Sequence, residues 1–360
     1  MSKIRVLIAD DSALMRREIR KILESDPDIE VIAIARNGLE AVEKTIELEP
    51  DVVALDINMP VMDGLTALQR IMMESPRPVV MVSSLTQEGA LTTYEALELG
   101  AVDFVGKPGG TISRDIAKVA KDIIYKVKGA ALANRNRLGK LRKKSPRRLA
   151  TTGLTRASRT GTKKREKIVV IGQSTGGPNT IMDILPFLNN DLDAAVIIVQ
   201  HMPATFTPSF AQRLDKNCAL PFKEAERGDI IRPNHGYLAP GDMHLHLATR
   251  GLNKPGALIR LSREPAETLH RPSVDVTMMS VLKRYAGPDI IAVLLTGMGS
   301  DGAEAMAAIR RAGGHTIAES EETCVVFGMP REAIARGGAE YVLPSYQIGE
   351  KILELAHRAG

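Results

Sequence analysis

Short apolar runs alternate with longer amphipathic stretches along the first 125 residues. The apolar runs predict buried strands at 4–9, 29–35, 52–55, 78–82 and 103–105. Between them, apolar residues recur at helical spacing over 13–24, 38–48, 64–73 and 89–99, and a last helix is expected from residue 113 to about 128. Five strand–helix units with nearly continuous apolar strands predict a parallel sheet covered by helices on both faces, the flavodoxin-like arrangement.

The same α/β alternation returns from residue 167 onwards. Strands are expected at 167–171, 194–200, 236–239, 244–248, 290–295, 315–318 and 341–343. Helices are expected at 178–185, 209–217, 273–284, 302–311 and 348–358. This pattern predicts a second, doubly wound α/β domain.

The segment between the two patterns is strongly basic. Residues 126–167 contain sixteen Lys and Arg residues and one acidic residue, Glu166, so the rest of the chain has a net charge of −10 although the whole chain has +5. Ser, Thr, Arg, Gly and Pro dominate 145–162, and few residues there are apolar. We therefore predict a flexible linker at 126–166 between domains at 1–125 and 167–360. It could be a solvated tether, a segment that docks on acidic surfaces, or a nucleic-acid contact, although no nucleic-acid-binding motif follows the first domain.

Composition restricts the class of protein further. The hydrophobic fraction is 44%, aromatic residues make up 3% and tryptophan is absent, so aliphatic side chains must form the cores. Two cysteines give neither a disulfide framework nor a zinc pattern, which favours a reducing, cytoplasmic setting. The first residues do not resemble a signal peptide, and no apolar run approaches the roughly 20 residues of a membrane helix.

Acidic residues gather where the strands of the first domain end. Asp10 and Asp11 follow the first strand, Asp56 ends the third, Ser83 ends the fourth and Lys107 follows the fifth. Carboxyl ends of parallel strands meet at one edge, so these side chains are expected to converge. Clustered carboxylates repel unless a hard cation such as Mg²⁺ is present, and a carboxylate beside that cation can attack a phosphoryl donor. Each acid taken singly could instead cap a helix.

A Gly-x-Ser-x-Gly turn centred on Ser174 follows the first strand of the second domain. Its spacing is typical of a nucleophile presented between a strand and a helix. A phosphate-binding turn is the rival interpretation, although the full G-x-G-x-x-G spacing is missing. His201 and Asp301 follow other predicted buried strands and could act as base and orienting carboxylate, and Asp301 alone could cap a helix. His244 and His246 alternate along one strand, which favours a structural or solvated role, and His270 could line a pocket.

The first domain resembles the response-regulator receiver over residues 4–125, through Asp10-Asp11, the segment from Asp56 to Gly64, Ser83-Ser84 and Lys107-Pro108. The resemblance implies that Asp56 is the phosphoacceptor. It implies that Asp11, Asp56 and the Asn58 carbonyl bind Mg²⁺, with Asp10 assisting through water. It also implies that Ser83, Phe104 and Lys107 form the phosphorylation switch.

The second domain resembles the catalytic domain of chemotaxis-type protein-glutamate methylesterases, through the segments 171–178, 200–202, 239–241, 270–275 and 295–302. The resemblance implies Ser174 as nucleophile, His201 as base and then acid, and Asp301 as its orienter. It implies that Thr175 and Met298 contribute backbone groups to an oxyanion site. Gln173 stands where the family has a small residue.

That family likeness implies a phosphorylation-activated serine esterase, a monomer without a cofactor for the esterase step, which hydrolyses glutamyl methyl esters of methyl-accepting chemoreceptors and deamidates receptor glutamines. A histidine kinase would supply the phosphoryl group, and contact with the membrane would come only through the receptors. We also expect the unphosphorylated first domain to cover the Ser174 cleft. Two other classes remain open: a gated hydrolase of small esters, and a non-catalytic adaptor or transcription regulator.

Overall fold

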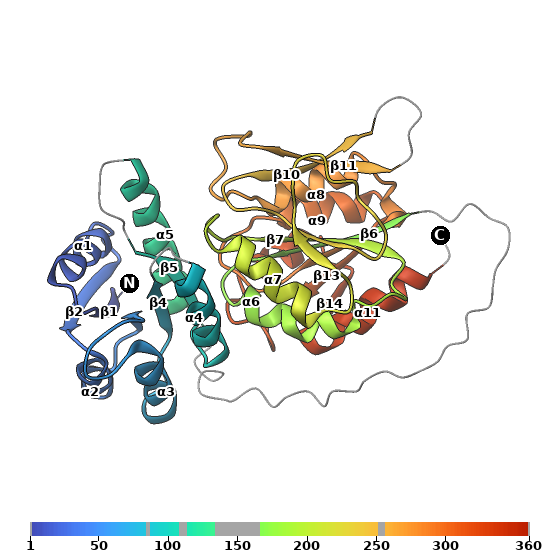
Figure 1. The fold of residues 1–360 in the computed structure, drawn as a ribbon. Helices are drawn as coiled ribbons and strands as arrows, with labels where there is room; N and C mark the ends of the chain where they lie inside the picture. The colour runs from blue at the N-terminus through green and yellow to red at the C-terminus, as the bar shows by residue number, and fades with distance from the viewer. Residues whose placement is uncertain (1, 84–86, 108–113, 134–165, 251–255, 359–360) are drawn as a thin grey trace, which may run out of the picture.

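The computed structural model describes residues 2–83, 87–107, 114–133, 166–250 and 256–358, and side chains at 87–91 and 114–118 are not described (Figure 1). Two separate parallel sheets form two α/β domains, so the predicted fold class is confirmed. Most of the predicted linker lies outside the described residues, and its boundaries stay a prediction. Within the described part of the chain, no helix is long and apolar enough to cross a membrane.

The N-terminal sheet has five parallel strands in the order β2-β1-β3-β4-β5. Its strands are β1 (Ile4–Ala9), β2 (Ile29–Ala35), β3 (Val52–Asp56), β4 (Val79–Ser83) and β5 (Asp103–Gly106). The helices are α1 (Ala13–Glu24), α2 (Gly38–Leu48), α3 (Gly64–Glu74), α4 (Gln87–Glu98) and α5 (Arg114–Ala131). Alternate residues of β1 face opposite layers: Leu7 packs toward the helices α2–α4, and Val6 and Ile8 pack toward α1 and α5.

The C-terminal sheet has seven parallel strands in the order β14-β13-β12-β6-β7-β9-β8, with a separate antiparallel pair β10-β11. Its strands are β6 (Lys167–Gln173), β7 (Ala194–Gln200), β8 (Phe222–Glu224), β9 (Gly236–Leu238), β12 (Ile290–Leu294), β13 (His315–Glu319) and β14 (Tyr341–Leu343), and the pair is β10 (His244–Thr249) and β11 (Ala257–Ser262). One face packs against residues 181–188, which follow the short helix α6 (Gly177–Thr180), and against α7 (Thr207–Asn217) and α11 (Ser345–His357). The other face packs against α8 (Val274–Leu282), α9 (Ala303–Arg311) and α10 (Met329–Ala335).

The second domain differs from the sequence-based expectation in several elements. Strands β8 and β11 and helix α10 were not predicted. The helix expected at 178–185 is only the short α6 followed by the 3₁₀ turns η2 (Ile181–Asp183) and η3 (Leu185–Phe187). Pro186 lies within η3 and cannot donate to a regular helical hydrogen bond, which explains the break. β10 belongs to the small antiparallel pair and not to the main sheet.

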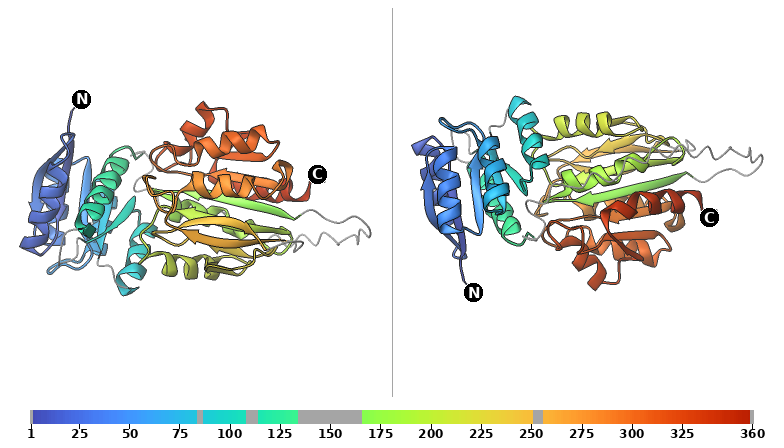
Figure 2. Two further views of the ribbon diagram at one scale, coloured as in Figure 1. Left: turned by 90° about the horizontal axis from the view of Figure 1, so that it is seen from above. Right: turned by 90° about the horizontal axis from the view of Figure 1, so that it is seen from below.

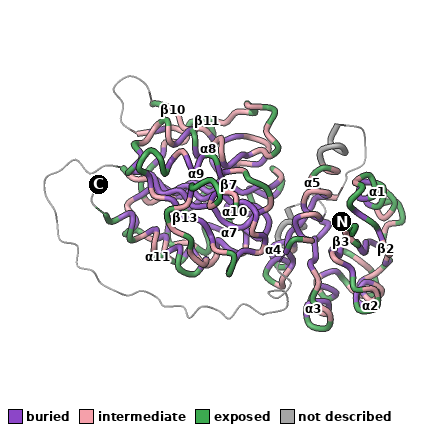
Figure 3. The backbone as a smooth tube through the Cα atoms, turned by 180° about the vertical axis from the view of Figure 1, so that it is seen from behind, coloured by how far each residue is buried: buried purple, intermediate pink, exposed green. Residues whose placement is uncertain are grey.

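The two domains share one continuous apolar cluster. Tyr94 and Phe104 of the N-terminal domain pack with Met202, Phe206 and Phe210 of the C-terminal domain, and all five are buried. The Phe104 and Phe206 ring centroids are 4.6 Å apart. Seen from the front and from above, α4 and α5 lie between the N-terminal sheet and the C-terminal domain (Figures 1 and 2). Buried backbone extends through the sheets of both domains (Figure 3).

Candidate active site and phosphorylation site

Neighbouring strands of the C-terminal sheet position three predicted residues. Gln173 at the end of β6 pairs in register with Gln200 at the end of β7, so Ser174 and His201 follow adjacent strand ends. β12 flanks β6 on its other side, with Leu294 opposite Gly172. The loop after β12 reaches Asp301, which contacts His201. The structure therefore gathers Ser174, His201 and Asp301 on one rim of the domain.

Backbone contacts hold the turn around Ser174. The Ser174 N–H donates to the Thr296 carbonyl at 3.0 Å, and the Gly177 N–H donates to the Ser174 carbonyl at 2.8 Å. Gly176 has a φ of 81°, which favours glycine, and a Cβ there would lie 2.5 Å from Val325. A Cβ on Gly297 would lie 2.7 Å from the Ser174 Cβ. Glycine at position 297 allows the loop after β12 to approach the serine turn closely, and glycine at position 176 leaves room for Val325.

His201 and Asp301 form a buried pair. The His201 Nε2 lies 2.8 Å from Asp301 Oδ2. A carboxylate accepts, so Nε2 carries the proton in the neutral ring and Nδ1 is left with its lone pair. Nδ1 is buried and has no hydrogen-bond partner among the described residues. It is therefore the ring nitrogen of His201 with a lone pair available to accept a proton.

Four donors converge on the Asp301 carboxylate. Ser273 Oγ donates to Oδ1 at 2.8 Å and the Asp275 N–H donates to Oδ1 at 3.0 Å. The Val274 N–H donates to Oδ2 at 2.7 Å, beside the His201 contact. Burial alone would raise the Asp301 pKa, but the hydrogen bond and charge of His201 and the backbone donors outweigh it, so the pKa is lowered. The first turn of α8 thus stabilises an ionised carboxylate.

Two aromatic side chains lie near this pair: His270, which the sequence suggested could line a pocket, and Tyr125, which it did not single out. The His270 ring stacks on His201 with a centroid distance of 3.9 Å. Burial, with the neighbouring His201, lowers the His270 pKa to about 3, so its ring is neutral. Tyr125 of α5 packs edge-on against His270, and its hydroxyl donates to the Met298 carbonyl at 2.6 Å. Burial raises the Tyr125 pKa, and the nearby Ser174 side chain opposes that rise.

Thr175 and Met298, the predicted oxyanion residues, both contact the N-terminal domain. Thr175 Oγ1 donates to Asp103 Oδ2 at 2.6 Å, and the Met298 carbonyl accepts from Tyr125. Asp103 in turn pairs with the buried Lys126 at 3.2 Å. The rim that holds Ser174 is therefore covered by α5 and β5. The sequence could not reveal Tyr125, because it comes from the other domain.

The acidic residues of the N-terminal domain also converge. Oxygens of Asp10, Asp11 and Asp56 lie within 4.8 Å of one another. Lys107 Nζ is 3.0 Å from Asp10 and 2.7 Å from Asp56. Burial raises the Asp56 pKa, although Lys107 opposes the rise. Three hard oxygen ligands at this spacing fit a small divalent cation such as Mg²⁺.

The remaining receiver residues surround this cluster at different depths. Ser83 is buried at the end of β4, and Asn58 is exposed just after β3. Phe104 is 1% exposed because it is covered by the C-terminal domain. The predicted switch aromatic thus lies in the domain interface, which connects the acidic cluster with the C-terminal domain.

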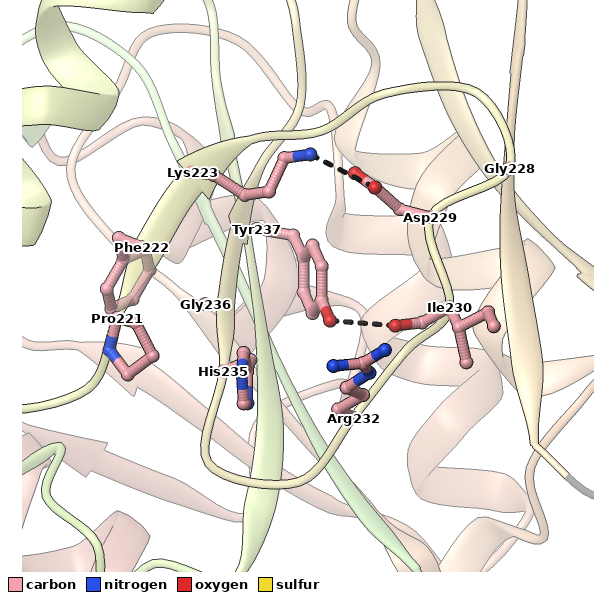
Figure 4. Close-up of a pocket in the computed structure, with 10 residues that line it drawn as sticks. All are labelled: Pro221, Phe222, Lys223, Gly228, Asp229, Ile230, Arg232, His235, Gly236 and Tyr237. Carbon is pink, nitrogen blue, oxygen red and sulfur yellow. Dashed lines mark hydrogen bonds and ion pairs between the residues drawn. The ribbon is translucent and has the colours of Figure 1, made fainter.

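A separate cavity of about 450 Å³ lies where β8 and β9 begin (Figure 4). It is lined by Pro221, Phe222, Lys223, Gly228, Asp229, Ile230, Arg232, His235, Gly236 and Tyr237. Lys223 pairs with Asp229, and the Tyr237 hydroxyl donates to the Ile230 carbonyl. None of the predicted site residues lines it, and it opens at the strand ends opposite Ser174.

The fold and these two sites define a response regulator joined to an α/β hydrolytic domain. Two family models match: CheB methylesterase over residues 169–352 and response regulator receiver domain over residues 6–115. The chain belongs to the CheB methylesterase family.

Its relatives share both domains. A protein of Caldanaerobacter subterraneus subsp. tengcongensis, named protein-glutamate methylesterase/protein-glutamine glutaminase, is 55% identical over 98% of this chain and 96% of its own length. A Carboxydothermus hydrogenoformans protein with the same name and the number 2 is 54% identical over 99% of each chain. The crystal structure of the Thermotoga maritima CheB methylesterase catalytic domain, 45% identical, covers 53% of this chain and 100% of its own, with a TM-score of 0.50.

Proposed function

We propose that this enzyme hydrolyses glutamyl methyl esters on chemoreceptors and deamidates receptor glutamines, under control of phosphorylation at Asp56. The observation behind the catalytic assignment is the His201–Asp301 pair beside the Ser174 turn. Support for the substrates comes from the relatives that share the name protein-glutamate methylesterase/protein-glutamine glutaminase.

In this mechanism the Ser174 oxygen attacks the ester or amide carbonyl while His201 Nδ1 takes the hydroxyl proton. Asp301 stabilises the imidazolium through Nε2–H. His201 then returns the proton to the leaving group, which departs as methanol or ammonia. Water attacks the acyl-enzyme while His201 takes its proton. His201 then donates this proton to the Ser174 oxygen, and glutamate and free Ser174 are released. Backbone N–H groups of Thr175 and Met298 are the proposed donors to the oxyanion.

The N-terminal cluster is the proposed site of control. Asp10, Asp11, Asp56 and the Asn58 carbonyl would hold Mg²⁺, which neutralises the charge of the phosphoryl donor. The Asp56 carboxylate takes the phosphoryl group, and Lys107 and Ser83 bind its oxygens. The donor is a histidine kinase. Lys107 exchanges its present ion pair with Asp56 for the phosphoryl group, because both compete for the same ammonium.

The docked receiver keeps the enzyme inactive in this proposal. Tyr125 contacts both Met298 and Ser174, and Asp103 holds Thr175. These side chains occupy the rim that a receptor glutamyl group must reach. Phosphorylation would move Ser83 and Phe104, and Phe104 packs on Phe206. The interface then loosens and the rim becomes accessible.

Methanol release from methylated receptor membranes tests this function. The full chain should release methanol faster with Mg²⁺ and a small phosphoryl donor than without, and Asp56→Asn should remove the stimulation while basal release remains. Ser174→Ala should remove all release. A 167–360 fragment should exceed the unphosphorylated full chain, and the Thermotoga maritima catalytic domain of similar extent shows that such a unit can be prepared.

Three outcomes would contradict the proposal. Full activity of Ser174→Ala would exclude the serine mechanism. A folded 167–360 fragment no more active than the unphosphorylated chain would exclude inhibition by the receiver. Hydrolysis of small esters without release from receptors would favour a different substrate.

A further inference from the structure

His244 and His246 are two residues apart on β10, but their surroundings differ. His244 is completely buried, whereas His246 is partly exposed and its Nε2 lies 3.2 Å from the Glu264 carbonyl. The pattern of alternating histidines predicted one structural or solvated role for both. The structure separates them, because only His244 reaches the turn that binds Asp301.

Hydrogen bonds fix the proton on the His244 ring. The Ser273 N–H donates to Nδ1 at 3.1 Å, so Nδ1 must present a lone pair. On the other side, Nε2 lies 3.1 Å from the Pro265 carbonyl and 3.1 Å from the Thr268 hydroxyl, which itself donates to that carbonyl. Both neighbours of Nε2 can accept, so the ring is neutral with its proton on Nε2.

The contact from His244 continues to the candidate catalytic pair. Three successive backbone N–H groups at the start of α8 donate hydrogen bonds. The N–H of Ser273 donates to His244, and those of Val274 and Asp275 donate to Asp301. The Ser273 hydroxyl also donates to Asp301. Since the first of these donors is anchored on His244, the ring sets the position of the other three.

We propose that His244 is a positioning residue of the esterase site: its Nδ1 anchors the Ser273 turn, which orients Asp301 toward His201. It touches neither substrate nor reacting atoms. Its role is to keep the carboxylate in line with His201 Nε2, where the present separation is 2.8 Å. A shift of this turn would leave Asp301 with fewer donors and a poorer contact to His201.

The ionisable groups around His244 agree with a neutral ring. Burial lowers its pKa, and Arg271 and His246 add to this effect, while Asp301 opposes it. Protonation would place an N–H against the Ser273 N–H, so the turn and the charged ring exclude each other.

Three single variants of the full chain, all phosphorylated in the same way, test this inference. His244→Leu removes the acceptor, His244→Asn retains an oxygen at the Nδ1 position, and His246→Leu is the matched control on the same strand.

By analogy with residues that orient other ligands, we expect His244→Leu to lower kcat by about tenfold with little change in KM. We also expect the acid side of the pH profile of kcat/KM for His244→Leu to move to lower pH, because a displaced Asp301 stabilises the His201 imidazolium less. His244→Asn should recover most of the activity, and His246→Leu should match the parent enzyme.

The inference rests on the proposed function, so a second readout separates the two. The rate at which a fluorophosphonate labels Ser174 reports the serine–histidine unit without any receptor. An enzyme that labels normally but releases no methanol would overturn the proposed substrate and leave the role of His244 intact. If folded His244→Leu retained the labelling rate and pH profile of His246→Leu, the inference would be wrong. Equal losses in His244→Asn and His244→Leu would also overturn it, since they would indicate a packing role alone.

Discussion

Asp301 illustrates how one carboxylate depends on the number of donors around it. Its two oxygens receive three donors from residues 273–275 and one from His201. An Asp301→Asn side chain has only one oxygen, so an amide N–H would face either His201 Nε2–H or a backbone N–H. We expect kcat to fall by about 10³–10⁴-fold, as when the equivalent interaction is lost in serine proteases.

Asp275→Asn is the matched control for this loss, measured as kcat for methanol release. Its carboxylate lies on the same turn but accepts from the Ala305 N–H at 2.8 Å, whereas the carboxylate of Asp301 pairs with His201. We expect its kcat to stay much closer to that of the parent. Similar losses in both variants would show that the turn, and not the Asp301 charge, determines the rate.

At Asp56, unlike at Asp301, burial outweighs the favourable charge interactions and raises the pKa of the carboxyl group. Its folded pKa is raised above the ordinary 3.8, chiefly by burial, so ionisation is less favourable in the folded chain than in the unfolded chain. The contribution of Asp56 to stability is therefore greatest below pH 3.8 and declines as pH rises through the folded pKa. We expect Asp56→Asn to be more resistant to urea than the parent at pH 7.

Comparing urea midpoints with and without Mg²⁺ checks the cause of this effect. The advantage of Asp56→Asn should disappear below pH 3.8, where the carboxyl is protonated in both states. Mg²⁺ should stabilise the parent more than the variant, because only the parent retains all three carboxylates. A variant less stable than the parent at pH 7 would mean that the Lys107 ion pair outweighs burial.

At the residue scale, the sequence predicted where the ionisable groups meet but not all their neighbours. Ser174, His201 and Asp301 could be placed on one rim because each follows a buried parallel strand. His270 and Tyr125 could not, since one lies in a loop and the other reaches the rim from a different domain. The catalytic roles of Ser174 and Asp301 stay predictions that Ser174→Ala and Asp301→Asn test.

Among the elements, apolar runs longer than three residues were the reliable signal. The predicted 13–24 and 38–48 helices match α1 and α2 at both ends, and 194–200 matches β7. β8 has only three residues, too few to show a period, and α10 contains Pro330 in its first turn. The prediction of a helix at 178–185 was wrong because the helical spacing of apolar residues does not reveal the break at Pro186.

The loop from β3 to α3 contains a strained position. Val61 has a φ of 67° and its side chain is 80% exposed, so no packing compensates a β-branched residue in the left-handed region. Asparagine adopts this conformation more readily. We expect Val61→Asn to raise the free energy of unfolding by about 1 kcal/mol, measured by urea denaturation.

Val342→Asn serves as the control for this prediction, because it removes another exposed valine, 46% exposed, from a strand. It should not stabilise the chain, since Val342 is in β14, where β-branched residues are favoured. Equal stabilisation by both substitutions would point to lower surface hydrophobicity and not to relief of backbone strain.

Across the whole molecule, the domain interface resembles an interior more than a loose contact. Aromatic side chains from both domains are buried together, and polar contacts flank them: Arg213 pairs with Glu98 at 2.8 Å, and Tyr94 donates to the Phe206 carbonyl at 2.9 Å. The sequence predicted two domains and a covered cleft, but not which surfaces meet. Each domain alone shows a complete α/β pattern, so the sequence does not distinguish the interface residues from ordinary core residues.

Tyr125 offers the smallest change that separates inhibition from folding. Tyr125→Phe removes the hydroxyl that donates to Met298 and contacts Ser174, and it keeps the ring against His270. A net hydrogen bond is worth about 1 kcal/mol, so basal methanol release should rise by up to about fivefold as the docked state is populated less. Release from the phosphorylated enzyme should hardly change, because its receiver has already moved.

Tyr285→Phe changes a partly buried tyrosine of the C-terminal domain and should leave both rates unaltered. If Tyr125→Phe kept the basal rate of the parent while remaining folded, the apolar contacts alone would hold the receiver in place, and Phe104 with Phe206 would become the pair to alter.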